Sequence, residues 1–282
     1  MQIIPTISAI RERLKDEPEI AFVPTMGNLH EGHLALVRQA KQQARCVVVS
    51  IFVNPLQFGP HEDLAKYPRT LAEDCEKLER EGVDILFTPT EAELFPIPQQ
   101  VSVEPPSIAN ELCGAFRPGH FRGVATIVLK LFNIVQPTAA IFGKKDYQQL
   151  YVIRAMVNQL NVPVNIAAGE TARASDGLAL SSRNGYLDVA EREEAVRLYR
   201  NLLQIKQDIL AGKADFAALE VKAKHDLETH GWRVDYISIR QQETLQAAKP
   251  GDASLVVLAA AWLGKTRLID NLEVCLETEQ AV

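Results

Sequence analysis

Two histidines separated only by a glutamate and a glycine form the segment best suited to chemistry. His30 and His33 follow an apolar run at residues 20–23 and a loop containing Gly27, and they precede an amphipathic stretch at residues 34–40. This order predicts a strand, a tight turn and a helix. A helix start offers free N–H groups and the positive end of a dipole to phosphate. A single histidine there is usually a cap or a surface residue. A pair favours nucleotide binding, because both rings can donate to the oxygens of a breaking phosphoanhydride.

A second junction of strand, glycine and helix follows the apolar residues 139–142. Behind Gly143, Lys145 can neutralise phosphate charge as a compact cation. Asp146 has two interpretations, as a helix cap or as an acceptor for a ribose hydroxyl or a metal ion. Gln149 lies one helical turn further on, where it could face the same pocket as Gln57.

Two further polar segments fit the same chemistry. Gln57 follows the very apolar run at residues 46–53, and its amide offers a donor and an acceptor to a hydroxy acid. Ser181, Ser182 and Arg183 would make a phosphate clamp, because arginine presents a rigid fork of donors. Each segment also has a plain interpretation as a turn with solvated side chains, and that alternative stays open.

Two clusters are ambiguous. Arg117, His120 and Arg122 precede a predicted helix, and they suit either an anion or a helix start with solvated charges. Asp74 lies in an acidic pair within the helix predicted for residues 68–82, and it suits either magnesium or a solvated helix face. Lipase-type, Walker-type, dinucleotide-fingerprint and zinc-ligand spacings do not occur in the sequence.

Most of the chain alternates between strand-like and helix-like segments, which predicts a parallel sheet. The fold class is therefore α/β, with a Rossmann-like doubly wound sheet whose ligands bind beyond the carboxyl ends of the strands. The predicted strands are residues 20–23, 46–53, 83–88, 139–142 and 162–168, and the predicted helices after the first include residues 68–82, 121–135 and 146–160.

The pattern changes after about residue 186. Two helices, at residues 188–210 and 214–229, precede three strand-like runs at residues 234–239, 254–260 and 267–274. This order predicts a smaller C-terminal α+β domain. We therefore expect a Rossmann-like nucleotide-binding domain at residues 1–185 and a small α+β lid domain at residues 186–282.

The composition excludes several classes of protein. The chain has 282 residues, of which 47% are hydrophobic and 23% charged, and its net charge is −6. This acidic balance argues against nucleic-acid binding. The four cysteines are too far apart for a C-x-x-C site and are expected to be buried free thiols. The sequence shows no signal peptide and no apolar run that could span a membrane, so a cytoplasmic location is expected.

Taken together, the motifs closely resemble those of the pantothenate synthetases (pantoate–β-alanine ligases), members of the HxGH nucleotidyltransferase superfamily. The histidine motif alone would indicate only the superfamily, whereas the whole set in this order is specific. The matching segments are residues 23–33, 50–58, 67–70, 117–121, 145–149 and 181–184.

The resemblance implies an ATP-dependent ligase. ATP and (R)-pantoate would give pantoyl adenylate and pyrophosphate, and β-alanine would then attack the adenylate to give pantothenate and AMP. Mg²⁺ would accompany ATP, and the protein would be a homodimer without nucleic-acid or membrane partners.

The resemblance also assigns residues. His33 would be the proton donor and would act with His30 and Lys145 in catalysis. Gln57 and Gln149 would bind pantoate, and Asp74 would be the metal ligand. The residues that would contact ATP are Met26, Gly27, Asn28, Leu29, His30, Glu31, Gly32, His33, Gly143, Lys144, Lys145, Asp146, Ala172, Leu180, Ser181, Ser182 and Arg183.

Two positions depart from the family pattern. Lys144 stands where an acidic residue is common, which changes the charge beside Lys145, and Leu180 replaces a common methionine. Three alternatives stay open: a different nucleotidyltransferase, which would have no need of Gln57 and Gln149, a fragment of an aminoacyl-tRNA synthetase, and a silent nucleotide-binding regulator.

Overall fold

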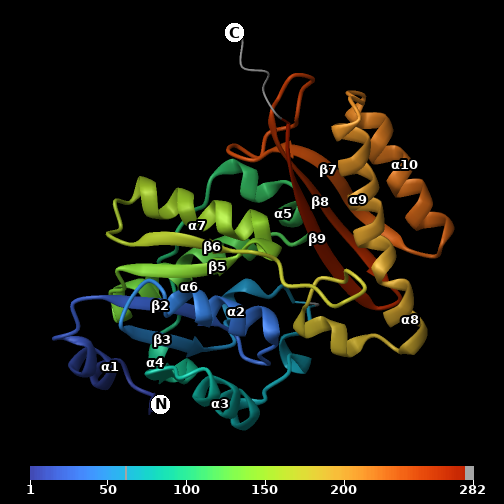
Figure 1. Cartoon of the computed structure of the whole chain (residues 1–282). Coiled ribbons are helices and arrows are strands. Elements are labelled where there is room, and N and C mark those ends of the chain that lie inside the picture. Colours follow the sequence, from blue (N-terminus) through green and yellow to red (C-terminus); the bar gives the residue numbers. More distant parts are fainter. Residues whose placement is uncertain (61, 277–282) are drawn as a thin grey trace. The chain divides into compact units, whose positions relative to one another are not determined.

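A six-stranded sheet forms the centre of the first part of the chain (Figure 1). The computed structural model describes residues 1–60 and 62–276. Every strand pair in this sheet is parallel, which confirms the predicted α/β class. The strands lie in the order β1-β4-β3-β2-β5-β6. Their bounds are β1 (Gln2–Ile4), β2 (Ile20–Thr25), β3 (Cys46–Ile51), β4 (Ile85–Phe87), β5 (Ala139–Gly143) and β6 (Asn165–Gly169).

Helices cover both faces of this sheet, because alternate strand residues point to opposite sides. On one face, Ala21 and Val23 pack with Val37 of α2 and Leu78 of α3. On the other face, Phe22 and Phe142 pack on Phe132 of α6, with ring centroids 6.4 and 6.3 Å apart. The helices of this part are α1 (Ile7–Leu14), α2 (Glu31–Ala40), α3 (Leu71–Arg80), α4 (Glu91–Leu94), α5 (Cys113–Phe116), α6 (His120–Val135) and α7 (Tyr147–Gln159).

The strand order reverses beside β2. From β2 the chain continues through β3 to β4 on one side, whereas β5 and β6 lie on the other side. Ligands of open parallel sheets bind at such a reversal, beyond the carboxyl ends of the two strands. The segments that follow β2 and β5 therefore lie at the expected site. Two short 3-10 turns belong to this edge, η1 (Pro55–Gln57) and η4 (Lys144–Asp146).

The chain divides into two compact units, Met1–Thr171 and Ala172–Val282. In the second unit, β7 (Arg233–Gln241), β8 (Ser254–Leu263) and β9 (Thr266–Cys275) form an antiparallel sheet. The helices α8 (Val189–Glu194), α9 (Val196–Leu210) and α10 (Phe216–Thr229) precede it, and the turn η5 (Ser182–Tyr186) comes before them. This is the predicted order of helices and then strands.

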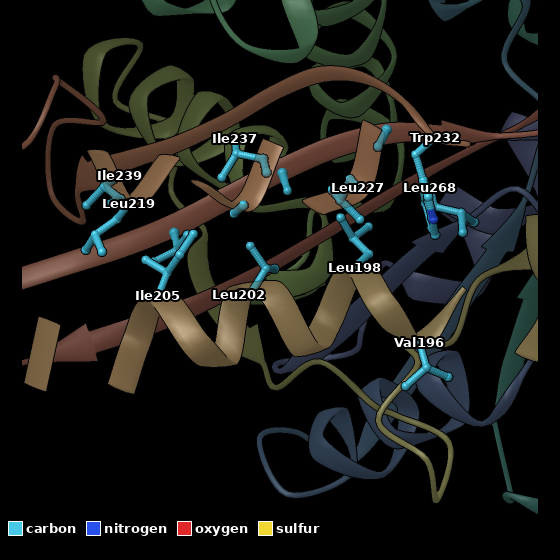
Figure 2. Packing of buried hydrophobic residues seen from close by; sticks show 14 of the residues in the cluster. Val196, Leu198, Leu202, Ile205, Leu219, Leu227, Trp232, Ile237, Ile239 and Leu268 are labelled. Atoms are coloured by element: carbon cyan, nitrogen blue, oxygen red, sulfur yellow. The ribbon is translucent and has the colours of Figure 1, made fainter. Parts of the chain in front are cut away.

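One face of this small sheet carries the core of the second unit (Figure 2). Apolar side chains of α9 meet those of α10 and of the strands because they recur about once per helical turn. The labelled members of this cluster are Val196, Leu198, Leu202, Ile205, Leu219, Leu227, Trp232, Ile237, Ile239 and Leu268.

The element bounds differ from the sequence predictions in a few places. The helix predicted for residues 188–210 is two helices, with Ala195 between them, and Asp188 and Glu191 form a capping box at the start of α8. The helix predicted from residue 68 begins at Leu71, while β1 and α1 were not predicted. The cysteines are free as expected, but only Cys46 and Cys113 are buried, whereas Cys75 is half-buried and Cys275 is exposed. Among the described residues, no helix has the length and apolarity needed to cross a membrane.

Candidate active site

The loop between β2 and α2 has a conformation that local sequence alone does not stabilise. Gly27 has φ +80° and Asn28 has φ +51°, both in the left-handed region. A Cβ atom on Gly27 would lie 3.0 Å from Ile51 Cγ2 and 3.2 Å from Asp74 Oδ2, and the positive φ would strain any other residue, so the position favours glycine. The Asp74 carboxylate accepts hydrogen bonds from Asn28 N at 2.9 Å and from Leu29 N at 2.8 Å. A buried side chain of α3 thus holds this loop.

His30 and His33 cap the start of α2 reciprocally. Nδ1 of His30 accepts from Gly32 N at 3.2 Å, and Nδ1 of His33 accepts from His30 N at 3.3 Å. A backbone N–H can only donate, so neither Nδ1 carries a proton. A neutral ring must then carry its proton on Nε2. The two ring centroids lie 4.1 Å apart, so two Nε2–H donors stand side by side at the helix start.

Both imidazoles are neutral at physiological pH. Burial, and secondly the charge of Lys145, lower the pKa of His30 from 6.5 to about 4. Burial and then the neighbouring His30 lower the pKa of His33 to about 3. A cation near either ring opposes protonation. The site therefore presents N–H dipoles rather than imidazolium charges.

The positive charge comes from the segment after β5. Lys145 affects the pKa of both histidines, which places its charge near the imidazole pair. Its Nζ atom lies 3.9 Å from Asp146 Oδ2. Lys144, the departure from the family pattern, has its Nζ atom 2.6 Å from Glu170 Oε1. That ion pair offsets the extra charge which the substitution introduces beside Lys145.

Gln57 lies at the end of η1 and contacts Met26 of the loop between β2 and α2. Its Nε2 atom lies 3.1 Å from Met26 Sδ, and its Oε1 atom accepts from Asn54 Nδ2 at 3.0 Å. The buried Asn54 amide also donates to Gly123 O and accepts from Leu56 N. The structure thus brings two of the predicted site residues together, and Asn54 fixes the orientation of the Gln57 amide.

The cluster around Arg117 supports the Gln57 turn. Arg117 forms a two-pronged ion pair with Glu62 and donates to His120 Nε2 at 3.0 Å. His120 Nδ1 therefore carries the proton and donates to Gln57 O at 2.8 Å. Burial, and secondly Arg117, lower the pKa of His120 to about 4. Arg117 and His120 therefore fit neither interpretation left open for this motif, because they support the backbone of Gln57. Arg122 fits the interpretation as a solvated charge, because it is exposed and forms an ion pair with the exposed Glu104 at 2.7 Å.

Gln149 lies in the first turn of α7, just beyond the carboxyl end of β5. It is half-buried, and its side chain makes no hydrogen bond with the part of the chain that the structure describes. Its neighbour Gln148 is buried and donates to the carbonyl groups of Ile108 and Glu111. Gln148 therefore has a structural role, while Gln149 keeps its amide available.

The remaining predicted contacts belong to the second unit. Ala172 O accepts from Leu180 N at 2.9 Å, so these two residues pair across a tight turn. Ser181 Oγ accepts from Arg183 N at 3.3 Å and caps η5, the short helix that Ser182 and Arg183 begin. Ser181, Ser182 and Arg183 therefore lie next to one another at the start of η5 in the second unit.

Sequence reasoning missed the loop-holding role of Asp74 and the role of His120 in supporting the backbone of Gln57. A signal for Asp74 was present, because it follows Leu71 by three residues and precedes Leu78 by four. Its carboxylate thus occupies the apolar face of an amphipathic helix. A charge in that position indicates a buried partner rather than a solvated surface.

Comparison with known proteins connects this geometry to a family. The sequence profile of the family "Pantoate-beta-alanine ligase" matches residues 2–273. The chain is 59% identical over 279 residues to a pantothenate synthetase of Nitrosospira multiformis, covering 99% of this chain and 100% of the relative. It is 62% identical over 275 residues to a pantothenate synthetase of Chromobacterium violaceum, covering 97% and 99%.

Solved structures show the same similarity. A pantothenate synthetase from Thermus thermophilus superposes with a TM-score of 0.94 at 44% identity, covering 98% of this chain and 100% of the other. A pantoate-beta-alanine ligase from Francisella tularensis, complexed with beta-gamma ATP and beta-alanine, superposes with a TM-score of 0.80 at 35% identity, covering 96% and 97%.

Proposed function

The chain belongs to the pantoate-beta-alanine ligase family, and on that basis we propose how its residues join (R)-pantoate to β-alanine with ATP. The family expected from the motifs is thus confirmed, and the chain is an ATP-dependent ligase. In the first step, a pantoate carboxylate oxygen attacks the α-phosphorus, and the bond to the pyrophosphate oxygen breaks. In the second step, the neutral amine of β-alanine attacks the acyl carbon. The bond from that carbon to the bridging oxygen breaks, and AMP leaves with the bridging oxygen.

The neutral histidine pair is the observation that supports the first step. Pantoate and ATP are both anions, so the attack needs donors that stabilise charge on the departing pyrophosphate. The Nε2–H groups of His30 and His33 stand at the reversal point of the sheet, beside the charge of Lys145. We assign these three groups to the phosphates. With a pKa of about 3, His33 donates a hydrogen bond and keeps its proton.

Gln57 and Gln149 are assigned to pantoate. Asn54 donates to Gln57 Oε1, so Gln57 Nε2 is the end of the amide with a proton to offer pantoate oxygens. Gln149 has its amide available at the neighbouring strand end. Two positioned amides would hold the carboxylate in line with the α-phosphorus, which reduces the entropic part of the barrier.

Mg²⁺ accompanies ATP in this proposal, but the protein offers it no built site in the part that the structure describes. No cluster of three or more His, Cys, Asp or Glu side chains suitable for a metal occurs there. Asp74, the predicted ligand, directs both oxygens to backbone N–H groups. The part of the chain that the structure describes thus has no ready-made cage for the ion, and we assign no step to it.

Contacts of ATP with Ala172, Leu180, Ser181, Ser182 and Arg183 stay predictions from the family resemblance, as do the lid role of the C-terminal domain and the homodimer. If Arg183 contacts phosphate, Arg183→Met should raise the KM for ATP more than that for pantoate. Equal changes in both constants would argue against the assignment.

Pyrophosphate release tests the proposed reaction. With ATP and (R)-pantoate, we expect a single burst of pyrophosphate, because the adenylate stays bound. Addition of β-alanine should convert the burst into steady turnover with formation of AMP. Release of pyrophosphate without pantoate, or a steady turnover that is equally fast with and without β-alanine, would indicate a different nucleotidyltransferase.

A further inference from the structure

We infer that Asp74 and Lys77 of α3 are positioning residues for adenylate formation, because they hold both backbone groups of Leu29, the residue before His30. The inference rests on the proposed function. Neither side chain is assigned to substrate. Each is argued to act through the loop at residues 27–29, which sets where the imidazole pair begins.

Asp74 is the stronger of the two contacts. It is fully buried, with 0% of its surface exposed. Its Oδ1 atom accepts from Leu29 N at 2.8 Å, and its Oδ2 atom accepts from Asn28 N at 2.9 Å and from Thr70 Oγ1 at 3.2 Å. A carboxylate leaves water only at high cost unless hydrogen bonds replace its hydration. Here the replacement comes mainly from the loop, and such charge-assisted bonds are short and directional.

Lys77 binds the other side of the same residue. Its Nζ atom donates to Leu29 O at 2.8 Å. The N–H group of Leu29 thus meets an anion and its C=O group meets a cation, so the peptide planes on both sides of Leu29 are fixed. The second of these planes leads into His30, whose backbone N–H in turn binds His33 Nδ1. The two contacts therefore reach both imidazoles through one short run of backbone.

The helical spacing allows both contacts to come from one turn. Residues three apart on a helix lie on one face, so one turn of α3 presents both charges to the loop. The close approach of Asp74 to the loop also favours a residue without a side chain at position 27, since a Cβ on Gly27 would lie 3.2 Å from Asp74 Oδ2.

The test compares Asp74→Asn and Lys77→Met with the control Glu76→Gln. Glu76 lies on the same helix and is exposed, and within residues 1–60 and 62–276 its one ion pair is with Arg80 at 3.0 Å, a surface contact of little energetic weight. We expect the burst rate of pyrophosphate to fall at least about tenfold in both variants, since small misplacements of reacting groups are costly. The KM for β-alanine should change less than about twofold, because the second step does not need the pyrophosphate contacts.

Amide spectra add a readout that a general loss of stability would not produce. In Asp74→Asn, the amide proton resonances of Asn28 and Leu29 should move upfield, because their acceptor loses its charge. The Glu76→Gln spectrum should match the parent there. If Asp74→Asn does not fold, Lys77→Met carries the test, because its side chain is only partly buried.

Three outcomes would overturn the inference. They are an unchanged burst rate in Lys77→Met, equal slowing of both half-reactions, and a defect in Asp74→Asn that added Mg²⁺ fully restores. The last result would make Asp74 a metal ligand. Failure of the proposed function is separate, because it would appear as absence of the burst in the unmodified protein.

Discussion

At the scale of single residues, the directions of the hydrogen bonds determine the state of the site. Backbone N–H groups bind Nδ1 of His30 and His33, whereas Arg117 binds Nε2 of His120. The first two rings therefore carry their proton on Nε2 and the third carries it on Nδ1. In the proposed function, the same residue type thus donates hydrogen bonds to phosphate in one place and supports the backbone in the other.

The neutral histidines make stability depend on pH. The pKa values of His30, His33 and His120 are lowered from 6.5 to about 4, 3 and 4. Below pH 6.5 the unfolded chain binds protons that the folded chain does not bind, so the free energy of unfolding should fall as pH drops towards these values. Urea unfolding at about pH 8 and about pH 5 measures this change. Equal or greater stability at the lower pH would contradict the assigned states.

Replacement of His33 tests its role in adenylation. His33→Ala should reduce pyrophosphate release about 10²- to 10³-fold, as loss of a transition-state donor does. Loss of its capping bond should lower stability by only about 0.5–2 kcal/mol. The burst assay and circular dichroism measure the two effects. The exposed His225 in α10 provides the control His225→Ala, which should behave as the parent.

Replacement of Gln57 should affect pantoate more than ATP. We expect Gln57→Ala to raise the KM for pantoate about tenfold, the effect of one lost hydrogen bond at a buried site. Initial rates at varied pantoate and varied ATP separate the two constants. A variant impaired only in ATP binding would show that Gln57 does not contact pantoate.

At the scale of elements, a close backbone approach fixes the position of the turn that carries Gln57. A Cβ on Gly123 of α6 would lie 2.1 Å from Leu56 O in η1. Only glycine therefore allows α6 to lie against the turn that carries Gln57. This contact, like that of Gly27 beside Asp74, joins elements that are distant in the sequence.

Gly123→Ala should move η1 and disturb Gln57. We expect a loss of about 1–3 kcal/mol in the free energy of unfolding, as for overpacking, together with a higher KM for pantoate. Gly119→Ala is the matched control, because nothing lies within 4 Å of its Cβ although its φ is +81°. The control should lose about 1–2 kcal/mol from backbone strain alone and keep the pantoate KM. A normal KM in Gly123→Ala would show that η1 does not need this contact.

At the scale of the whole molecule, each unit has its own sheet and its own core. In the second unit, a buried ion pair joins the start of the unit to its last strand. Arg173 donates to both oxygens of Asp270 at 2.7 and 2.8 Å, and its guanidinium lies 4.2 Å from the centroid of the Tyr199 ring. This pair holds the segment that leads to Ser181 and Arg183.

Removal of one partner of the Arg173–Asp270 ion pair should lower the free energy of unfolding more than removal of both partners. We expect Arg173→Met to cost about 3–5 kcal/mol, because the Asp270 carboxylate would stay buried without its counter-charge. The double variant Arg173→Met/Asp270→Leu should recover part of that loss. Urea unfolding of both variants gives the values. A loss in Arg173→Met below about 1 kcal/mol would be typical of a solvated pair and would contradict this role.

Local sequence was enough to predict most elements and the family. Apolar periodicity, glycine stops and short motifs are local properties, so they predicted strands at residues 46–53 and 139–142, the loop before His30 and the order of the C-terminal elements. The structure has these strands at Cys46–Ile51 and Ala139–Gly143. Motif order across the chain then identified the family, which the comparisons confirm.

The contacts between distant residues could be found only in the folded chain. Asp74 lies 45 positions from Leu29, and His120 lies 63 positions from Gln57, so no local pattern pairs them. The burial that makes the imidazoles neutral likewise depends on strands and helices from separate parts of the chain. Protonation states and supporting contacts follow from packing, and packing is a property of the folded chain rather than of any single segment.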